Sequence, residues 1–293
     1  MPSPADRQLS VPPNLPLLLA TGALTSPGKR GPYEGARLPE TRLVLSDAPV
    51  DAKALRAYTQ VCGFPTAAQL PPTYPHILGF PLAMRLMADR GFPFPLLGLV
   101  HTEIGLTQHR ALHTADRPEI AVHAEGLDPH RKGSQFAVVT EAYLGGETVW
   151  ESRSTYLCRH RTDSAPEERT APKPPDPLPV RATWELPGGL GRRYAAASGD
   201  RNPIHLHPLT AKLFGFPRHI AHGMWTFARC LAEAGPPERF TARAEFKAPV
   251  LLPGTVTYGE RDGAFELRGA GSDGRLHLSG TLVTGKPAAS GRP

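Results

Sequence analysis

The segment from Thr162 to Pro179 constrains the fold of this chain more than any other stretch, because it holds six prolines. Proline fixes its own φ, lacks a backbone N–H and restricts the residue before it, so such a run excludes a regular helix or a central strand. Pro-rich segments form extended, semi-rigid connections instead. We therefore predict a linker over residues 162–179 that separates one domain in residues 1–161 from a second in residues 180–293, sizes that suit ordinary domains.

Both sides of the linker show the same order of predicted elements, in which a strand and helices are followed by several β-rich stretches. Residues 1–40 are rich in Pro and Gly and are expected to form an extended arm. The first half then predicts strands at 42–45, 97–112, 119–125, 135–143 and 147–159, and helices at 51–61, with Asp51 as cap, and 80–89. The second half predicts strands at 181–186, 239–246, 255–260, 264–268 and 275–283, and helices at 208–214 and 223–234. Gly145-Gly146, Asp262-Gly263 and Asp273-Gly274 mark hairpin turns. This repetition predicts an α+β fold built from an internal duplication.

The stretch from Tyr194 to His205 is the strongest candidate for a functional site. It places the carboxylate of Asp200, the amide of Asn202 and the imidazole of His205 within six residues, on a loop shaped by glycine and proline. A carboxylate and an imidazole that converge on one volume can carry out general acid–base chemistry. Asp and Asn are also common turn formers, so Asp200 alone would favour a structural role.

The pattern Y-x3-S-G-D-x-N-P-I-H from Tyr194, with His205–Pro208 and Phe216–Met224 after it, resembles the signature of the MaoC-like, R-specific enoyl-CoA hydratases. The resemblance implies a double hotdog, two units that each wrap a curled antiparallel sheet around a central helix, and it is sharp only in the second half. It implies that Asp200 and His205 act on water and substrate, and that the N–H of Gly223 binds the thioester oxygen. His207 departs from the family, in which Asp is frequent at that position.

The remaining residues around this signature carry weaker expectations. Gly223 begins the predicted helix 223–234, where a backbone N–H lacks an intrahelical partner and lies at the positive end of the dipole; the alternative is a glycine chosen for tight packing. Asn202, Ser198 and His222 are expected to contact the substrate, although Asn202 and Ser198 also suit a role in shaping the loop and His222 one in supporting the helix start.

The resemblance implies reversible hydration of trans-2-enoyl thioesters to (R)-3-hydroxyacyl thioesters, without metal or redox cofactor, on coenzyme A or acyl carrier protein. Three alternatives stay open: a thioesterase on the same fold, a non-catalytic hotdog that binds acyl thioesters, and a metal-dependent hydrolase that uses the cluster His205, His207, His219 and His222. The sequence contains no dinucleotide fingerprint, P-loop or nucleophile elbow that would indicate another class.

Three histidines of the first half, His76, His101 and His109, lack the Asp-x-Asn-Pro-x-His context. We interpret them as satisfied histidines of a degenerate half that has no chemistry of its own and helps to form the acyl-chain tunnel.

The net charge of +6 is dispersed along the chain, which argues against nucleic-acid binding and suits a phosphate-bearing small molecule or an acidic carrier protein. No apolar run is long enough to cross a bilayer. Three scattered cysteines predict buried thiols in a reducing cytoplasm. A cytoplasmic protein is expected, and a homodimer is possible because double-hotdog chains often pair again.

Overall fold

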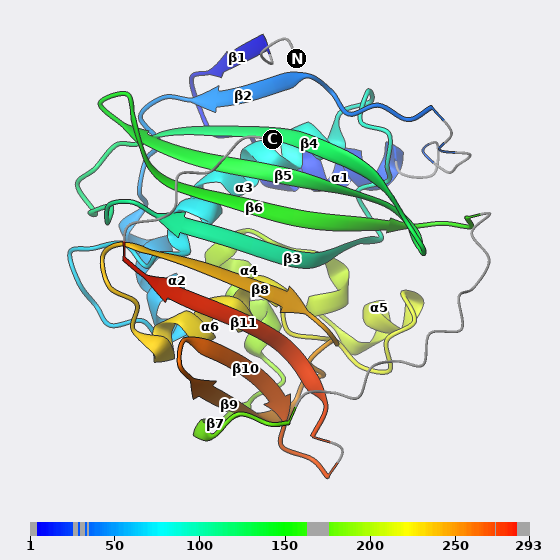
Figure 1. Ribbon diagram of the computed structural model, residues 1–293. Helices are drawn as coiled ribbons and strands as arrows, with labels where there is room; N and C mark the ends of the chain where they lie inside the picture. The colour runs from blue at the N-terminus through cyan, green and yellow to red at the C-terminus, as the bar shows by residue number, and fades with distance from the viewer. Residues whose placement is uncertain are drawn as a thin grey trace.

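A computed structural model describes residues 5–25, 29, 33, 35–162, 176–272 and 274–285. Most of the predicted linker (163–175) and Asp273 of one predicted turn lie outside these residues. The strands form a single eleven-stranded sheet in the order β1-β2-β4-β5-β6-β3-β8-β11-β10-β9-β7, and the sheet curves around the helices (Figure 1). Within the described residues, no helix has the length and apolar character needed to span a membrane.

The N-terminal half of the sheet comprises β1 to β6 and confirms the strands predicted there. Its elements are β1 (Ala5–Leu9), α1 (Leu15–Thr25), β2 (Thr41–Leu45), α2 (Ala52–Cys62), α3 (Tyr74–Ala88), β3 (Leu99–Gln108), β4 (Glu119–His130), β5 (Gly133–Leu144) and β6 (Glu147–Arg159). As predicted, Asp51 caps α2, with its carboxylate accepting from the N–H of Ala54 at 2.7 Å.

Two predictions for this half were wrong. The arm contains β1 and α1, because β1 pairs with the distant β2 and Pro16 lies in the first turn of α1, where its missing N–H has no cost. Helix α3 begins at Tyr74 rather than Phe80. Pro75 occupies its first turn, and the helix continues through Pro81.

The C-terminal half confirms its predicted strands and the helices at 208–214 and 223–234 to within two residues at each end, and it adds one helix and one 3₁₀ turn that were not predicted. Its elements are β7 (Val180–Leu186), α4 (Leu190–Ser198), the 3₁₀ turn η2 (Pro203–His205), α5 (Pro208–Leu213), α6 (Gly223–Ala234), β8 (Phe240–Phe246), β9 (Gly254–Arg261), β10 (Ala264–Gly269) and β11 (Leu276–Thr284).

The two halves share one topology. From the centre outward the strands run β3-β6-β5-β4-β2 on one side and β8-β11-β10-β9-β7 on the other. If β1 and α1 are set aside, each half has a first strand that precedes its helices and four consecutive antiparallel strands that follow them. The antiparallel pairing of β3 with β8, from Glu103 opposite Glu245 to Gln108 opposite Phe240, joins the halves. This correspondence supports the predicted duplication, and it makes α3 and α6 equivalent central helices.

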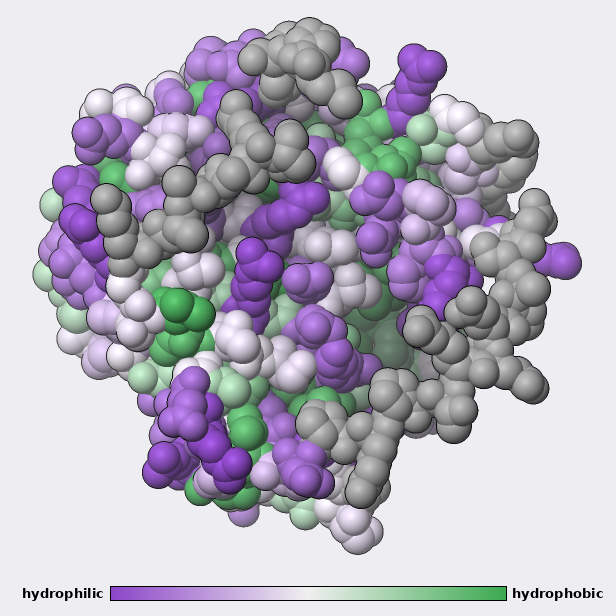
Figure 2. Space-filling model, viewed as in Figure 1, coloured by the Kyte–Doolittle hydropathy of each residue, from purple (hydrophilic) through white to green (hydrophobic). Residues whose placement is uncertain are grey.

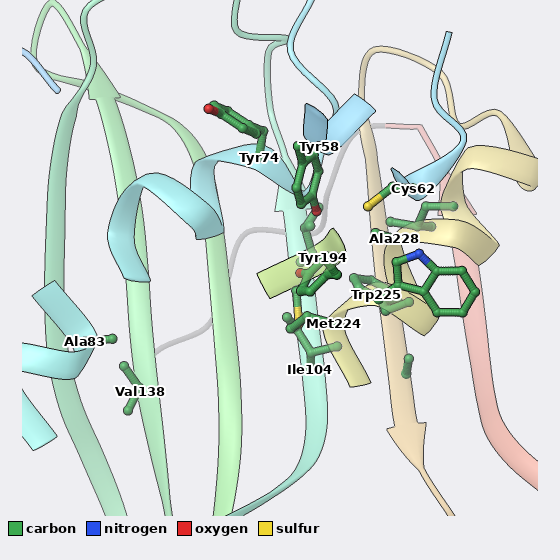
Figure 3. Close-up of a cluster of buried hydrophobic side chains, with 14 of the residues drawn as sticks. Tyr58, Cys62, Tyr74, Ala83, Ile104, Val138, Tyr194, Met224, Trp225 and Ala228 are labelled. Carbon is green, nitrogen blue, oxygen red and sulfur yellow. The ribbon is translucent and has the colours of Figure 1, made fainter. Parts of the chain in front are cut away.

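The hydrophobic core runs across the junction between the halves. The rings of Tyr58 in α2 and Tyr194 in α4 lie 5.9 Å apart, and the indole N–H of Trp225 in α6 donates to the carbonyl of Val61 at 2.8 Å. Figure 3 shows Tyr194 below Tyr58 and above Met224 and Ile104, so helices of both halves and strand β3 meet at one point. Helices α4 and α6 therefore depend on the N-terminal half for their position.

The surface and the thiols agree with the predictions from composition. Hydrophilic residues are spread over the whole face in Figure 2, with smaller hydrophobic areas between them. The three cysteines are free and buried, and burial raises the pKa of the Cys62 and Cys230 thiols.

Candidate active site

The loop that follows α4 fixes the carboxylate of Asp200. Gly199 ends the helix in the left-handed conformation, with φ of 80° and its N–H bonded to the carbonyl of Ala195. The hydroxyl of Ser198 then accepts from the N–H of Asp200 at 3.2 Å, and the Asp200 carboxylate accepts from the N–H of Asn202 at 3.2 Å. The Asp200 side chain remains 31% exposed, so one carboxylate oxygen is held by the loop while the group stays accessible.

The turn η2 presents His205 in a defined tautomer. The amide oxygen of Asn202 accepts from the N–H of Ile204 at 3.4 Å and so caps the turn. The imidazole is buried, and its Nδ1 lies 2.9 Å from the carbonyl oxygen of Ile220. Because a carbonyl can only accept, Nδ1 carries the proton in the neutral ring and Nε2 carries the lone pair. The Nε2 atom of His205 can therefore accept a proton.

A close backbone contact sets the position of this turn. Gly191 lies in α4 against η2, and a Cβ on residue 191 would be 2.0 Å from the carbonyl oxygen of His205. No real Cβ approaches a backbone oxygen so closely. The glycine therefore allows α4 and the turn that carries His205 to pack together.

His222 joins the two ends of the loop. Its Nε2 donates to the backbone carbonyl of Asp200 at 3.0 Å, and its ring stacks on that of His205 with centroids 3.7 Å apart. The ring of Tyr194 also packs against the ring of His222, with the two centroids 4.7 Å apart. His222 thus supports both Asp200 and His205.

Helix α6 begins directly after His222, with Gly223 as its first residue. The first hydrogen bond of the helix runs from the N–H of Thr226 to the carbonyl of His222 at 3.1 Å. The N–H of Gly223 precedes this ladder and lies at the positive end of the helix dipole. A Cβ on residue 223 would approach the ring of Phe246 to 3.2 Å, so the glycine lets this ring pack closely against the start of the helix.

The role that the resemblance implies for Gly223 predicts that Gly223→Ala lowers kcat by about 10- to 100-fold, because the added methyl group would displace Phe246 or a ligand at the N–H, and loss of one oxyanion donor is worth on the order of 10²–10³. The measurement is kcat in the reaction that the resemblance implies, the hydration of an enoyl thioester. Gly105→Ala is the matched control, since its Cβ would meet only the Arg243 side chain at 3.9 Å. Equal activity of the two variants would contradict the assignment.

Burial keeps the imidazoles of the site neutral. It lowers the pKa of His205, against the opposing charge of Asp200 and the hydrogen bond to Ile220. Burial, followed by the neighbouring His205, lowers the pKa of His222 to about 3. Burial also lowers the pKa of His76 to about 4 and that of His101 to about 3.

These shifts predict acid destabilisation. Below pH 6.5 the unfolded chain protonates His76, His101 and His222 while the folded chain does not, so the free energy of unfolding falls as pH falls toward about 4. Each group contributes up to about 1.4 kcal/mol per pH unit in this window. Urea unfolding at several pH values between 7 and about 4.5 measures the slope. A free energy that stays flat over this window would contradict the buried neutral state.

The first half was predicted to hold satisfied histidines, and in two of the three one nitrogen is left unpaired. His109 does pair, with its Nε2 3.2 Å from a carboxylate oxygen of Glu151. Nδ1 of His76 and Nε2 of His101, in contrast, are buried and have no hydrogen-bond partner among the described residues. The Asp200 carboxylate raises the pKa of both rings, so both lie within its field. A signal was present in the sequence, since His76 lies near the start of one central helix as His222 does before the other.

The histidines of the predicted cluster make different contacts and do not act as one group. Nδ1 of His207 accepts from the N–H of Leu209 at 3.2 Å and caps α5, which gives this departure from the family a structural role. Nε2 of His219 donates to the carbonyl of Gly188 at 2.7 Å. Within the described residues, the groups that could share a metal ion are Asp200, His205 and His222, whose ligand atoms lie within 4.8 Å of one another.

The geometry of these three groups is poor for a metal ion. Tetrahedral zinc with bonds of about 2.1 Å needs donors about 3.4 Å apart, with lone pairs aimed at one point. The rings of His205 and His222 are stacked 24° from parallel, so their in-plane lone pairs do not converge. We expect a chelator to leave activity unchanged and metal analysis to find far less than one ion per chain. Activity that is lost with the chelator and restored by zinc would contradict this.

Comparison with known proteins shows a family and a relative to which this chain is similar in sequence. The family profile described as "MaoC like domain" matches residues 170–261. The chain is similar to 3-hydroxyacyl-thioester dehydratase X of Mycobacterium tuberculosis, with 38% identity over 253 residues that cover 84% of this chain and 90% of the relative.

Solved structures extend the similarity to the fold. A crystal structure of HtdX from Mycobacterium tuberculosis matches with a TM-score of 0.72 and 38% identity, covering 82% of this chain and 98% of that one. A MaoC-like dehydratase from Phytophthora capsici matches with a TM-score of 0.68 at 18% identity, covering 87% and 98%, and shows the fold alone. Because these matches extend over both halves, the predicted α+β double hotdog is confirmed.

Proposed function

The chain belongs to the MaoC-like dehydratase family and is a hydro-lyase, and from this premise we propose that it interconverts trans-2-enoyl thioesters and (R)-3-hydroxyacyl thioesters. The observation that carries the proposal is the convergence of the Asp200 carboxylate with the imidazole of His205, whose proton the bond to Ile220 places on Nδ1, near the helix start at Gly223. This set matches the three tasks of the reaction.

Hydration adds a hydroxyl group at C3 and a proton at C2, while negative charge develops on the thioester oxygen. In the proposed mechanism, Asp200 and His205 hold one water between them and share the proton transfers, a contribution of about 10²–10⁴-fold. The N–H of Gly223 donates to the thioester oxygen. Asn202, Ser198 and His222 act mainly by positioning, because their recorded hydrogen bonds hold the loop.

The substrate carrier and the assembly follow from weaker observations. We propose coenzyme A as the first carrier and acyl carrier protein as the second, since a net charge of +6 suits the phosphates of either. The reaction needs no metal or redox cofactor. We further propose that residues 1–161 and 180–293 are the two hotdog units joined by the linker 162–179, with the catalytic groups in the second, and that such chains pair as homodimers.

The test is the loss of enoyl absorbance from a short and a medium trans-2-enoyl-CoA, repeated with enoyl-carrier protein, with chiral analysis of the product. We expect the (R)-3-hydroxyacyl thioester. A wild-type protein that binds both thioesters without turnover would support a non-catalytic hotdog instead. Release of free thiol without hydration would support a thioesterase.

A further inference from the structure

Helix α5 presents an apolar side to solvent. Leu209 and Leu213 are four residues apart and therefore lie on one face of the helix. They are 66% and 83% exposed, and Phe214, directly after the helix, is 40% exposed. In Figure 1, α5 lies beside the sheet, to the right of α4. Single exposed leucines are common on protein surfaces, but three large apolar side chains within six residues form a patch. We name these three residues the α5 patch.

Hydrogen bonds fix the α5 patch to the active-site turn η2. The hydroxyl of Thr210 in α5 donates to the carbonyl of Pro203, the first residue of η2, at 2.7 Å. Ala211, on the side of α5 opposite the leucines, is buried. The guanidinium of Arg192 in α4 donates to the carbonyl of Leu206, between η2 and α5, at 3.1 Å. The α5 patch therefore adjoins the turn and is held in a fixed orientation toward it.

The chain around the α5 patch is rich in positive charge. The segment from Gly188 to His222 contains five basic residues and a single carboxylate, that of Asp200 in the site. The basic residues are exposed, and none of them forms an ion pair within the part of the chain that the structure describes; they are Arg192, Arg193, Arg201, Lys212 and Arg218. An excess of exposed positive charge of this kind attracts an anionic partner.

The α5 patch distinguishes between the two proposed carriers of the acyl group. Coenzyme A is a small, highly charged molecule whose phosphates guanidinium groups alone can bind, and this binding does not require an apolar helix face. An acyl carrier protein is acidic, and it presents its thioester on a phosphopantetheine arm beside a folded surface. Only this second carrier combines negative charge with a protein surface that can bury leucine and phenylalanine side chains.

We propose that the α5 patch and the basic residues around it form the docking surface for a small acidic protein that carries the acyl thioester, the chemistry of an acyl carrier protein. A partner bound there lies beside the turn η2, and its arm has a short path to His205. This inference rests on the proposed function and names the carrier that the active site uses.

The test compares, by titration calorimetry, the affinities of hexanoyl-CoA and of a bacterial acyl carrier protein loaded with the same hexanoyl group. This acyl group has neither a double bond nor a hydroxyl group, so binding is measured without turnover. We expect Leu209→Ser and Leu213→Ser each to weaken binding of the carrier-linked ligand by about five- to tenfold, the effect of an interface residue that contributes to affinity. The affinity for hexanoyl-CoA is expected to stay unchanged. Val283→Ser on β11 is the matched control, because Val283 is 63% exposed outside the α5 patch.

Lys212→Glu tests the contribution of charge. In the wild type, the affinity for the carrier-linked ligand is expected to fall as ionic strength rises, because salt screens the attraction between exposed charges. This fall is expected to be smaller in Lys212→Glu. Lys53→Glu is the matched control and is expected to keep the wild-type salt dependence, because it reverses an exposed charge on α2 in the N-terminal half.

Three results would overturn the docking surface. The first is a wild-type protein that does not bind the carrier-linked ligand. The second is an equal loss of both affinities in the leucine variants, which would show that α5 only supports the turn η2. The third is a wild-type dimer that Leu213→Ser converts to monomers in sedimentation equilibrium, which would assign the α5 patch to a second copy of the chain. Turnover of an enoyl thioester by the wild type is measured separately, so failure of the surface and failure of the proposed function are distinguishable.

Discussion

Asp200→Asn and His205→Gln are each expected to reduce kcat by about 10²–10⁴-fold while the fold is retained. Both changes preserve size and remove the ionisable group. Asn can still accept the hydrogen bond that Asp200 receives from the N–H of Asn202. Gln is close to His in volume, and His205→Asn is measured beside it because the Asn amide takes the position of Nδ1, which donates to the carbonyl of Ile220. The loss therefore falls on proton transfer rather than on loop structure.

The measurement is kcat and KM for hydration with the thermal unfolding midpoint recorded beside them. Asp47→Asn is a suitable control for the first variant, because Asp47 adopts φ of 52°, which Asn tolerates. His109→Gln is a control for the second. If either active-site variant kept more than about a tenth of the wild-type kcat, the assignment of that residue as an acid–base group would fail.

Gly191→Ala is expected to destabilise the protein by about 3 kcal/mol and to abolish most activity. Helix propensity alone predicts the opposite, since alanine is favoured over glycine inside a helix by about 1 kcal/mol. Packing dominates, because the Cβ would lie 2.0 Å from the carbonyl oxygen of His205. Either α4 or the turn η2 must move, and overpacking of this kind costs about 1–3 kcal/mol or more.

Urea unfolding and kcat measured on the same samples test this prediction. Gly188→Ala is the matched control three residues earlier, where the nearest neighbour of the new Cβ would be Pro253 at 3.8 Å. We expect Gly188→Ala to be close to wild type in both measurements. A Gly191→Ala variant that is more stable than wild type would show that helix propensity outweighs the packing cost and that the contact with His205 is easily relieved.

The sequence predicted the start of α2 and most elements of the second half well, because their signals are local. The start of α6 at Gly223, the hairpin glycines and the cap at Asp51 each depend on a few adjacent residues. The errors arose where the secondary structure of a segment depends on a partner that is distant in the sequence. Strand β1 forms because it pairs with β2, and α3 starts early because Pro75 is compatible with a first turn although it looks like a break.

The same distinction applies to the site. Asp200, His205 and Gly223 were found because their spacing forms one pattern along the chain. His76 and His101 were assigned to satisfied positions, because the packing that leaves one buried nitrogen of each ring unpaired has no local pattern in the sequence. A bulge in β3 after His101, where the register with β6 shifts, is likewise invisible in a residue pattern.

The ladder between β3 and β8 has a consequence for how the site responds to mass action. Two separate chains that complete a site together dissociate on dilution, and their activity then depends on concentration. Here the two halves that pair through this ladder belong to one polypeptide, so their local concentration is set by the tether between them rather than by the amount of protein. Freed from the need to match an identical copy, each half can vary its side of the ladder independently.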